Sequence, residues 1–313
     1  MKAVLDYLPG PRVRAILDEV FGDRVNVVCV AEADAAGLNR EAADCDVRLH
    51  VLKPVAADFI QSASRLRLVQ KIGIGVDTID LAAAKAKSVA VCNMPGTNTQ
   101  AVAELALSLM LAAVRRLKPL DRETFDGRGW ERGTELFDGI GEIGGVTVGL
   151  LGYGAVPRRM APVLKALGAN VVTYARREPE DGTRRLELEE LLAVSDIVSL
   201  HLPLSNETLH LLDEDRIALM KKGAIIVNTA RGGLIDEAAL AIALEKGHIA
   251  GAAVDVFSAE PVKVENPLLR APNVLATPHV AWLTTETWRR SFIVARENCE
   301  RLRRGEPLLH RVA

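Results

Sequence analysis

The sequence predicts an α/β fold with two domains, each a doubly wound parallel sheet covered by helices on both faces. Three observations lead to this expectation. The chain has 313 residues, which exceeds the size at which a single hydrophobic core usually stops growing. Short apolar runs alternate with helical patterns along the whole chain, as they do in the strand–helix–strand units of parallel sheets. About ten such runs are present, too many for one ordinary open sheet.

The apolar runs are the candidate strands. They are rich in β-branched residues and are apolar at both odd and even positions, which is typical of strands buried on both faces. In chain order they are residues 24–30, 45–52, 66–74, 88–94, 145–152, 169–175, 195–202, 223–230, 249–257 and 273–280.

Two long helices are expected, one after the apolar run that ends at residue 94 and one after the run that ends at residue 280. A Thr or Asn at 97–99 can cap a long apolar helix that extends to Leu117. Because this helix carries Glu104 and ends in arginines, packing inside a domain is favoured over a membrane span. A second helix runs from the threonines at 284–285 to a stop at Gly305.

The composition limits the class of protein. Hydrophobic residues make up 49% of the chain and charged residues 26%, which is ordinary globular composition. A formal net charge of −2 provides no field that would attract nucleic acid or a membrane surface. The N-terminus lacks the apolar run of a secretory signal, so a cytoplasmic location is expected. The four cysteines are scattered, so neither a disulfide framework nor a metal site is expected.

A glycine-rich turn follows the run that begins at residue 145. Gly152 and Gly154 stand between an apolar strand and a helical stretch, the context in which a glycine fingerprint indicates dinucleotide binding. Gly152 permits the tight turn, and Gly154 lets a pyrophosphate approach the backbone at the helix N-terminus. The third glycine of the fingerprint is replaced by Pro157, which a first helical turn tolerates. An ordinary glycine-rich turn is the alternative.

Two arginines stand where an NAD-binding unit usually places a carboxylate. The second strand of the unit ends at Ala175, about 20 residues after the glycines, near the position of the Asp or Glu that binds the ribose 2′-OH of NAD. Arg176 and Arg177 follow, and a guanidinium can hold a 2′-phosphate bidentately. NADP(H) is therefore the favoured cofactor and NAD(H) the alternative. The plainer interpretation is that both arginines form a solvated strand end.

Three segments place reactive side chains at the carboxyl ends of apolar runs, where open α/β sheets collect their ligands. They are Arg231 in "NTARGGLID", Asp255 and Glu260 in "AAVDVFSAEP", and His279 in "NVLATPHVAW". Taken singly, Arg231 could form a surface ion pair, Glu260 could be a loop charge, and His279 could be a capped core histidine.

Together, these segments are ordered as in a known family. From "KIGIGVDTID" through "NTQAVAELALSLMLAAVRR", "VGLLGYGAV" and "NTARGGLID" to "TPHVAW", the sequence resembles the D-isomer specific 2-hydroxyacid dehydrogenases. These NAD(P)-dependent enzymes include glyoxylate and hydroxypyruvate reductases. The resemblance spans nearly the whole chain. It implies a flavodoxin-like substrate domain at residues 1–97, a Rossmann dinucleotide-binding domain inserted at 98–280, and a C-terminal helix at 281–313 that returns to the substrate domain.

The resemblance also implies roles for individual residues. Arg231, Glu260 and His279 are the implied catalytic residues, and His279 is the general acid that protonates the C2 oxygen as hydride arrives from the nicotinamide. Glu260 would favour the charged imidazole and fix its ring. Arg231 and the backbone amides of Ile74 and Gly75 would bind the substrate carboxylate. The implied cofactor-binding residues are Gly152, Tyr153, Gly154, Ala155, Val156, Ala175, Arg176, Arg177, His201, Pro203, Thr229, Ala230 and Asp255.

The expected substrate is a small 2-oxo acid, with glyoxylate or hydroxypyruvate first. Leu52, which would border the substrate, and Lys53 stand where phosphoglycerate dehydrogenases of the family place an arginine. A dehydrogenase of D-lactate or phosphoglycerate is one alternative, and a dinucleotide-sensing interaction protein, like the corepressors that share this fold, is another. The resemblance further implies a homodimer formed by the helix from Asn98 to Leu117 and an arm at 122–139, with Trp130 as an interface anchor or a core residue.

Overall fold

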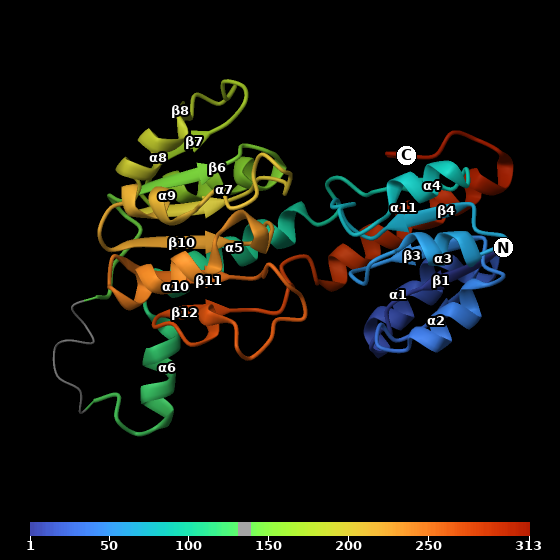
Figure 1. The fold of residues 1–313 in the computed structure, drawn as a ribbon, viewed down its shortest axis with the longest axis horizontal. Coiled ribbons are helices and arrows are strands. Elements are labelled where there is room, and N and C mark those ends of the chain that lie inside the picture. The colour runs from blue at the N-terminus through green and yellow to red at the C-terminus, as the bar shows by residue number, and fades with distance from the viewer. Residues whose placement is uncertain (131–138) are drawn as a thin grey trace. The chain divides into compact units, whose positions relative to one another are not determined.

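The computed structural model describes residues 1–130 and 139–313 of the chain (Figure 1). The described chain divides into two compact units. Unit 1 consists of Met1–Asn98 and Trp282–Ala313, and unit 2 consists of Thr99–Ala281. In the sequence, unit 2 is therefore an insertion into unit 1.

Unit 1 is built around a five-stranded parallel sheet with the order β2-β1-β3-β4-β5, which is the flavodoxin-like order. Its strands are β1 (Lys2–Leu5), β2 (Asn26–Cys29), β3 (Val47–His50), β4 (Leu68–Lys71) and β5 (Ala90–Cys92). Its helices are α1 (Pro11–Phe21), α2 (Ala35–Ala42), α3 (Ala57–Ser62), α4 (Leu81–Ala86) and α11 (Thr285–Arg304).

Helix α11 returns the end of the chain to unit 1. Thr284 caps it by accepting a hydrogen bond from the Thr287 amide, and Gly305 ends it with a left-handed φ of 71°, which glycine adopts at no steric cost. Trp288 and Phe292 of this helix are buried, with their ring centroids 5.0 Å apart. The start and the stop predicted for this helix are confirmed.

Unit 2 contains a seven-stranded parallel sheet with the order β12-β11-β10-β9-β6-β7-β8, which without β12 is the Rossmann order. Its strands are β6 (Thr147–Leu151), β7 (Asn170–Tyr174), β8 (Arg184–Arg185), β9 (Ile197–Leu200), β10 (Ala224–Asn228), β11 (Ile249–Val254) and β12 (Val274–Ala276). Its helices are α5 (Thr99–Val114), α6 (Leu117–Phe125), α7 (Ala155–Ala166), α8 (Leu188–Val194), α9 (Glu214–Leu219) and α10 (Glu237–Glu245).

Apolar side chains cover both faces of the unit 2 sheet. Ile226 and Val227 are neighbours on β10, yet they belong to different buried clusters, because successive strand residues point to opposite faces. Ile226 packs in the cluster that contains Leu240 of α10, and Val227 packs in the one that contains Leu164 of α7. The predicted fold class of two doubly wound parallel sheets is confirmed.

Two of these strands have no counterpart among the predicted runs. β1 has only four residues, Lys2–Leu5, although it lies inside the unit 1 sheet between β2 and β3 and is almost fully buried. β8 consists of Arg184 and Arg185 and carries no apolar signal. β1 and β8 are recognised as strands by their main-chain pairing with neighbouring strands and not by a hydrophobic pattern in the sequence.

The long apolar helix predicted from Asn98 to Leu117 is present as α5, but it ends three residues earlier than predicted. α5 ends at Val114, Arg116 adopts a left-handed φ of 51°, and α6 begins at Leu117. Of the predicted dimer arm, residues 131–138 lie outside the described residues. Within the described part of the chain, no helix is both long and apolar enough to cross a membrane.

Candidate active site

The predicted site residues of unit 2 follow the carboxyl ends of its parallel strands (Figure 1). Because the strands all run in one direction, residues that follow them meet at one edge of the sheet. We call this edge the carboxyl edge of unit 2. The residues found there are Gly152 after β6, Ala175 after β7, His201 after β9, Thr229 after β10, Asp255 after β11 and His279 beyond β12.

The turn between β6 and α7 has no room for a side chain at its first glycine. Gly152 has a φ of 97°, and a Cβ at this position would lie 2.8 Å from the carbonyl oxygen of His201. At Gly154, in contrast, a Cβ would meet no atom within 4 Å, so the space beside the backbone is open where α7 begins. Pro157 lies in the first turn of this helix. Because the first amides of a helix attract anions, this turn fits a pyrophosphate.

Two polar side chains near this turn also fit a bound dinucleotide. Among the described residues, the buried Thr229 hydroxyl has no hydrogen-bond partner, which is costly unless a ligand bonds it. Nε2 of His201 lies 2.9 Å from the Ser199 hydroxyl, and burial lowers the pKa of His201 to about 4, so its ring is neutral at pH 7. Of the other implied cofactor residues, Tyr153 lies in the same turn and Ala155 and Val156 begin α7. Pro203 and Ala230 lie in the loops after β9 and β10.

Arg176 and Arg177 follow β7 with exposed side chains. Neither takes part in an ion pair within the described residues, whereas Arg185 on the neighbouring strand β8 pairs with Glu187. Nε of Arg185 also donates to the carbonyl oxygen of Ala175 at 2.7 Å, which fixes the turn that carries the two arginines. Both guanidinium groups are thus available to an anionic ligand.

His279 and Glu260 form the central pair of the site. Nδ1 of His279 lies 2.6 Å from Oε2 of Glu260, and the amide of Phe257 donates to Oε1 of Glu260 at 2.9 Å. Burial by itself would raise the pKa of Glu260, but the hydrogen bond and charge of His279, the Phe257 amide and the charge of Arg231 together hold this pKa below its ordinary value. The carboxylate is therefore ionised at neutral pH and orients the imidazole ring.

The loop that carries His279 is anchored on Asp255. The buried Asp255 carboxylate accepts hydrogen bonds from the Thr277 hydroxyl at 2.5 Å, the Val280 amide at 2.9 Å and the Ala281 amide at 2.8 Å. The His279 amide donates to the backbone oxygen of Asp255 at 2.7 Å. These bonds hold His279 at a φ of 54°, a left-handed conformation that costs a non-glycine residue roughly 1–2 kcal/mol. Asp255, predicted as a cofactor-binding residue, also supports the His279 loop.

Arg231 is positioned by the end of β10. The side chain of Asn228 donates to the Arg231 carbonyl at 2.9 Å and accepts a hydrogen bond from the Ala230 amide at 3.0 Å. The next residue, Gly232, packs directly on the segment after β11, because a Cβ there would lie 1.9 Å from the carbonyl carbon of Phe257. Only glycine permits this approach of two backbones.

The predicted substrate-binding residues of unit 1 follow β3 and β4. The Leu52 amide donates to Oε1 of Glu32 at 3.2 Å. Ile74 is 45% exposed, and its carbonyl accepts a hydrogen bond from the Asn93 side chain at 3.0 Å. Among the described residues, no backbone carbonyl accepts a hydrogen bond from the amide of Ile74 or of Gly75, so both can donate to an anion.

Sequence reasoning does not single out Asn228 or Gly232. Asn228 is buried at the end of an apolar strand, and a polar amide near the end of such a run is the signal that could have found it. For Gly232, the signal is the glycine pair directly after Arg231. No cluster of three or more His, Cys, Asp or Glu side chains within the described residues could hold a metal ion.

A Rossmann sheet with a glycine turn and a histidine–carboxylate pair at its carboxyl edge is the arrangement of a dinucleotide-dependent oxidoreductase. Residues 107–281 match the family model of the NAD-binding domain of D-isomer specific 2-hydroxyacid dehydrogenases. The chain is 40% identical over 261 residues to a glyoxylate reductase of Aeropyrum pernix, a match that covers 80% of this chain and 78% of the relative.

Two further similarities extend this result. The chain is 40% identical over 263 residues to a D-3-phosphoglycerate dehydrogenase of Archaeoglobus fulgidus, covering 82% of this chain and 49% of the relative; it thus spans about half the length of that relative. The crystal structure of the TT0316 protein from Thermus thermophilus is similar over 100% of both chains, with 34% identity and a TM-score of 0.90.

The chain belongs to the D-isomer specific 2-hydroxyacid dehydrogenase family. This is a family of oxidoreductases whose cofactor is a nicotinamide dinucleotide, and the family predicted from the sequence is confirmed.

Proposed function

We propose that the chain reduces a small 2-oxo acid, with glyoxylate or hydroxypyruvate first, to the D-2-hydroxy acid. The observation that carries this proposal is the 2.6 Å contact between Nδ1 of His279 and Oε2 of Glu260 at the carboxyl edge of unit 2. With a carboxylate on Nδ1, the ring exchanges its proton with the substrate through Nε2. His279 is then the general acid in reduction and the general base in the reverse direction.

The substrate also needs a fixed orientation. The nicotinamide cofactor, when bound, supplies the hydride. Arg231 suits the planar carboxylate of a 2-oxo acid, because its fork can donate two parallel hydrogen bonds. Its Nη1 donates to the Ala230 carbonyl at 2.8 Å, which restricts the orientation of the fork. In unit 1, the amides of Ile74 and Gly75 are the proposed anion donors.

The substituent on C2 is proposed to be small and uncharged. Two cations near Leu52 are already engaged, because Nζ of Lys53 donates to the Glu32 carbonyl at 3.0 Å and Arg48 is buried against Asp6 at 2.8 Å. Arg48 cannot offer its charge to a phosphate without giving up Asp6, whereas the neutral Glu32 carbonyl engages one of the three donors of Lys53. The name of the Aeropyrum pernix relative supports the same substrate class. The name of the Archaeoglobus fulgidus relative makes a phosphorylated 2-oxo acid the competing substrate to test.

NADPH is the proposed reductant. Ala175 places no carboxylate at the end of β7 that would repel a 2′-phosphate, and the exposed side chains of Arg176 and Arg177 follow it directly. A guanidinium binds a phosphate through two hydrogen bonds and keeps its charge at every working pH.

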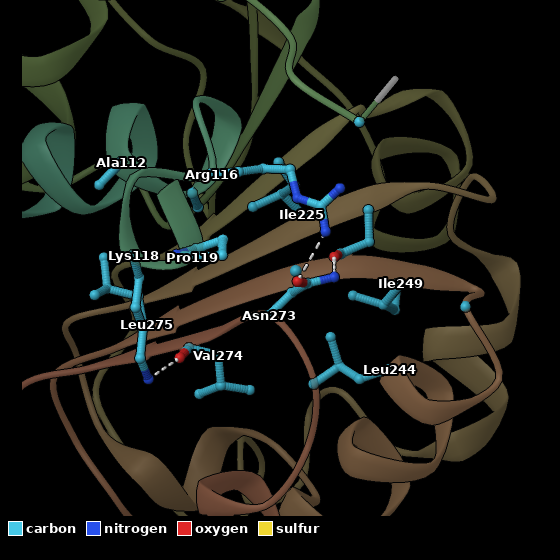
Figure 2. Close-up of a pocket in the computed structure, with 15 residues that line it drawn as sticks. Ala112, Arg116, Lys118, Pro119, Ile225, Leu244, Ile249, Asn273, Val274 and Leu275 are labelled. Carbon is cyan, nitrogen blue, oxygen red and sulfur yellow. Dashed lines mark hydrogen bonds between the residues drawn. The ribbon is translucent and has the colours of Figure 1, made fainter. Parts of the chain in front are cut away.

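Two copies of the chain are proposed to associate through α5 and α6. Phe125 and Trp130, at and beyond the end of α6, are 86% and 87% exposed. A hollow of about 180 Å³ lies beside the start of α6. Its lining includes Pro119, Ile249 and Leu275 (Figure 2). Exposed aromatic side chains are typical of an interface. Light scattering of the purified chain tests this, since a dimer has twice the 33.8 kDa of one chain.

Initial rates test the proposed reaction. The purified chain is assayed with glyoxylate, hydroxypyruvate and 3-phosphohydroxypyruvate, each with NADPH and with NADH. Reduction of either small acid that disappears in His279→Ala supports the proposal. Turnover of the phosphorylated acid alone would move the substrate to the competing class, and no turnover of any 2-oxo acid would reject the reaction.

A further inference from the structure

Glu237, the first residue of α10, binds both ends of the loop that carries Glu260. We call residues 258–266 the Glu260 loop. Oε1 of Glu237 accepts a hydrogen bond from the Ser258 amide at 2.6 Å, and Oε2 accepts one from the Asn266 side chain at 2.7 Å. One carboxylate thus joins both ends of the Glu260 loop to the first turn of α10.

The beginning of this loop is also confined from the other side. A Cβ at Gly232 would lie 1.9 Å from the carbonyl carbon of Phe257 and 2.2 Å from the amide nitrogen of Ser258. The Phe257 amide donates to Glu260, and the Ser258 amide donates to Glu237. Two consecutive amides therefore point to two carboxylates, and the first of these carboxylates holds His279.

The Glu237 carboxylate is not needed to cap its own helix. Asp236 is the N-cap of α10, and its side chain accepts hydrogen bonds from the amides of Ala238 and Ala239. Most residues of the Glu260 loop are exposed, so burial of apolar surface contributes little to holding the loop. Hydrogen bonds to a charged carboxylate are roughly twice as strong as neutral ones, which makes Glu237 a strong anchor for this loop.

We propose that Glu237 is a positioning residue, which fixes the Glu260 loop so that Glu260 stays within hydrogen-bond distance of His279. The inference rests on the proposed function, because it takes the Glu260–His279 pair as the proton-transfer pair. Glu237 acts through the Ser258 amide and the Asn266 side chain, and its own carboxylate is occupied by them. Since a misplacement of about 1 Å can cost a hundredfold in rate, loosening this loop affects the chemical step more than binding.

Three variants test this role by kinetics. Glu237→Ala removes both acceptors, Glu237→Gln keeps an acceptor for the Ser258 amide, and Glu245→Ala removes an exposed glutamate from the far end of the same helix. We expect kcat to fall roughly tenfold or more in Glu237→Ala, with the KM for the cofactor unchanged and most of the rate restored in Glu237→Gln. A kcat within twofold of the parent, or an equal loss in Glu245→Ala, would overturn the inference.

Trypsin gives a second readout that does not depend on turnover. Lys263 is exposed within the Glu260 loop, and the rate of cleavage after it reports how often the loop opens. We expect cleavage after Lys263 to be roughly tenfold faster in Glu237→Ala than in the parent and in Glu245→Ala. Equal cleavage rates in all the proteins would refute the anchoring role whatever the substrate is. If the parent chain reduces no 2-oxo acid, the proposed function is rejected, but faster cleavage in Glu237→Ala would still show that Glu237 anchors the loop.

Discussion

Replacing Glu260 with glutamine keeps the shape of the side chain beside His279 but removes its charge. In the parent chain the two side chains are 2.6 Å apart, and the Glu260 carboxylate is ionised, since His279 and Arg231 hold its pKa below the ordinary value despite burial. An ionised carboxylate stabilises the protonated imidazole, which is the form that donates a proton during reduction. In Glu260→Gln the amide oxygen can still accept the Nδ1 hydrogen, but the attraction between charges is lost.

The size of the effect follows from the difference between two kinds of hydrogen bond. A hydrogen bond to a charged group contributes about 1.5–3 kcal/mol and a neutral one about 1 kcal/mol, so the substitution costs the protonated state about 0.5–2 kcal/mol. The two side chains are 22% and 33% exposed, which places the expected value in the lower half of this range. At neutral pH, kcat for reduction should therefore fall roughly 2- to 8-fold.

The assay is the pH profile of kcat for glyoxylate reduction at saturating NADPH. Because the attraction between the two charges is lost in Glu260→Gln, its kcat should lie below that of the parent throughout the neutral part of the profile. Glu265→Gln, an exposed glutamate of the same loop, is the matched control and should reproduce the parent profile. Superimposable profiles for Glu260→Gln and the parent would show that the Glu260 charge does not act on the proton donor.

Three further predictions concern the cofactor and stability. Replacing Arg176 and Arg177 by alanine should lower the ratio of kcat/KM with NADPH to kcat/KM with NADH at least tenfold, about 1.4 kcal/mol. The control Arg184→Ala should leave this ratio unchanged. An unchanged ratio in the double variant would show that the two arginines only form a solvated strand end. Gly152→Ala should lower the melting temperature and weaken cofactor binding in a fluorescence titration, since its Cβ would lie 2.8 Å from a backbone carbonyl; a parent-like titration would contradict the proposed pyrophosphate turn. Burial lowers the pKa of His50 from 6.5 to about 4. As the pH falls, His50 is therefore protonated in the unfolded chain before it is protonated in the folded chain. The stability from this group is present above pH 6.5 and is lost toward pH 4. In urea unfolding, the free energy of unfolding should be about 2 kcal/mol lower at pH 5 because of this group. His50→Gln should weaken this dependence of stability on pH. If the parent and the variant lose stability equally as the pH falls, His50 is not its source.

The fold class could be predicted because each strand buried on both faces leaves a continuous apolar run in the sequence. The turn at Gly152 could be predicted as well, since the residues that shape it are adjacent in the chain. β1 (Lys2–Leu5) escaped prediction although it lies inside its sheet, because Lys2 and Asp6 leave only three apolar residues between them. The end of α5 at Val114 was predicted three residues too late, since Leu117 continues the apolar pattern after Arg115 and Arg116.

The residues that position the catalytic side chains could not be predicted for a different reason. Asn228 acts on the backbone of residues two and three positions ahead, so only the folded turn reveals its role. Glu237 reaches Ser258 and Asn266, which are far along the chain, and its position at the start of a helix suggests a capping role instead. Asp255 stands out in the sequence, but the three donors on its carboxylate come from a later loop.

The most direct test of the central claim is the initial rate of glyoxylate and hydroxypyruvate reduction with NADPH, measured for the parent chain and for His279→Gln. If His279 is the general acid, the parent should turn over at least one of the two acids, and the variant should lose roughly a hundredfold or more of kcat while it still binds NADPH. A variant that keeps the parent rate, or a parent that reduces neither acid, would contradict the proposed reaction.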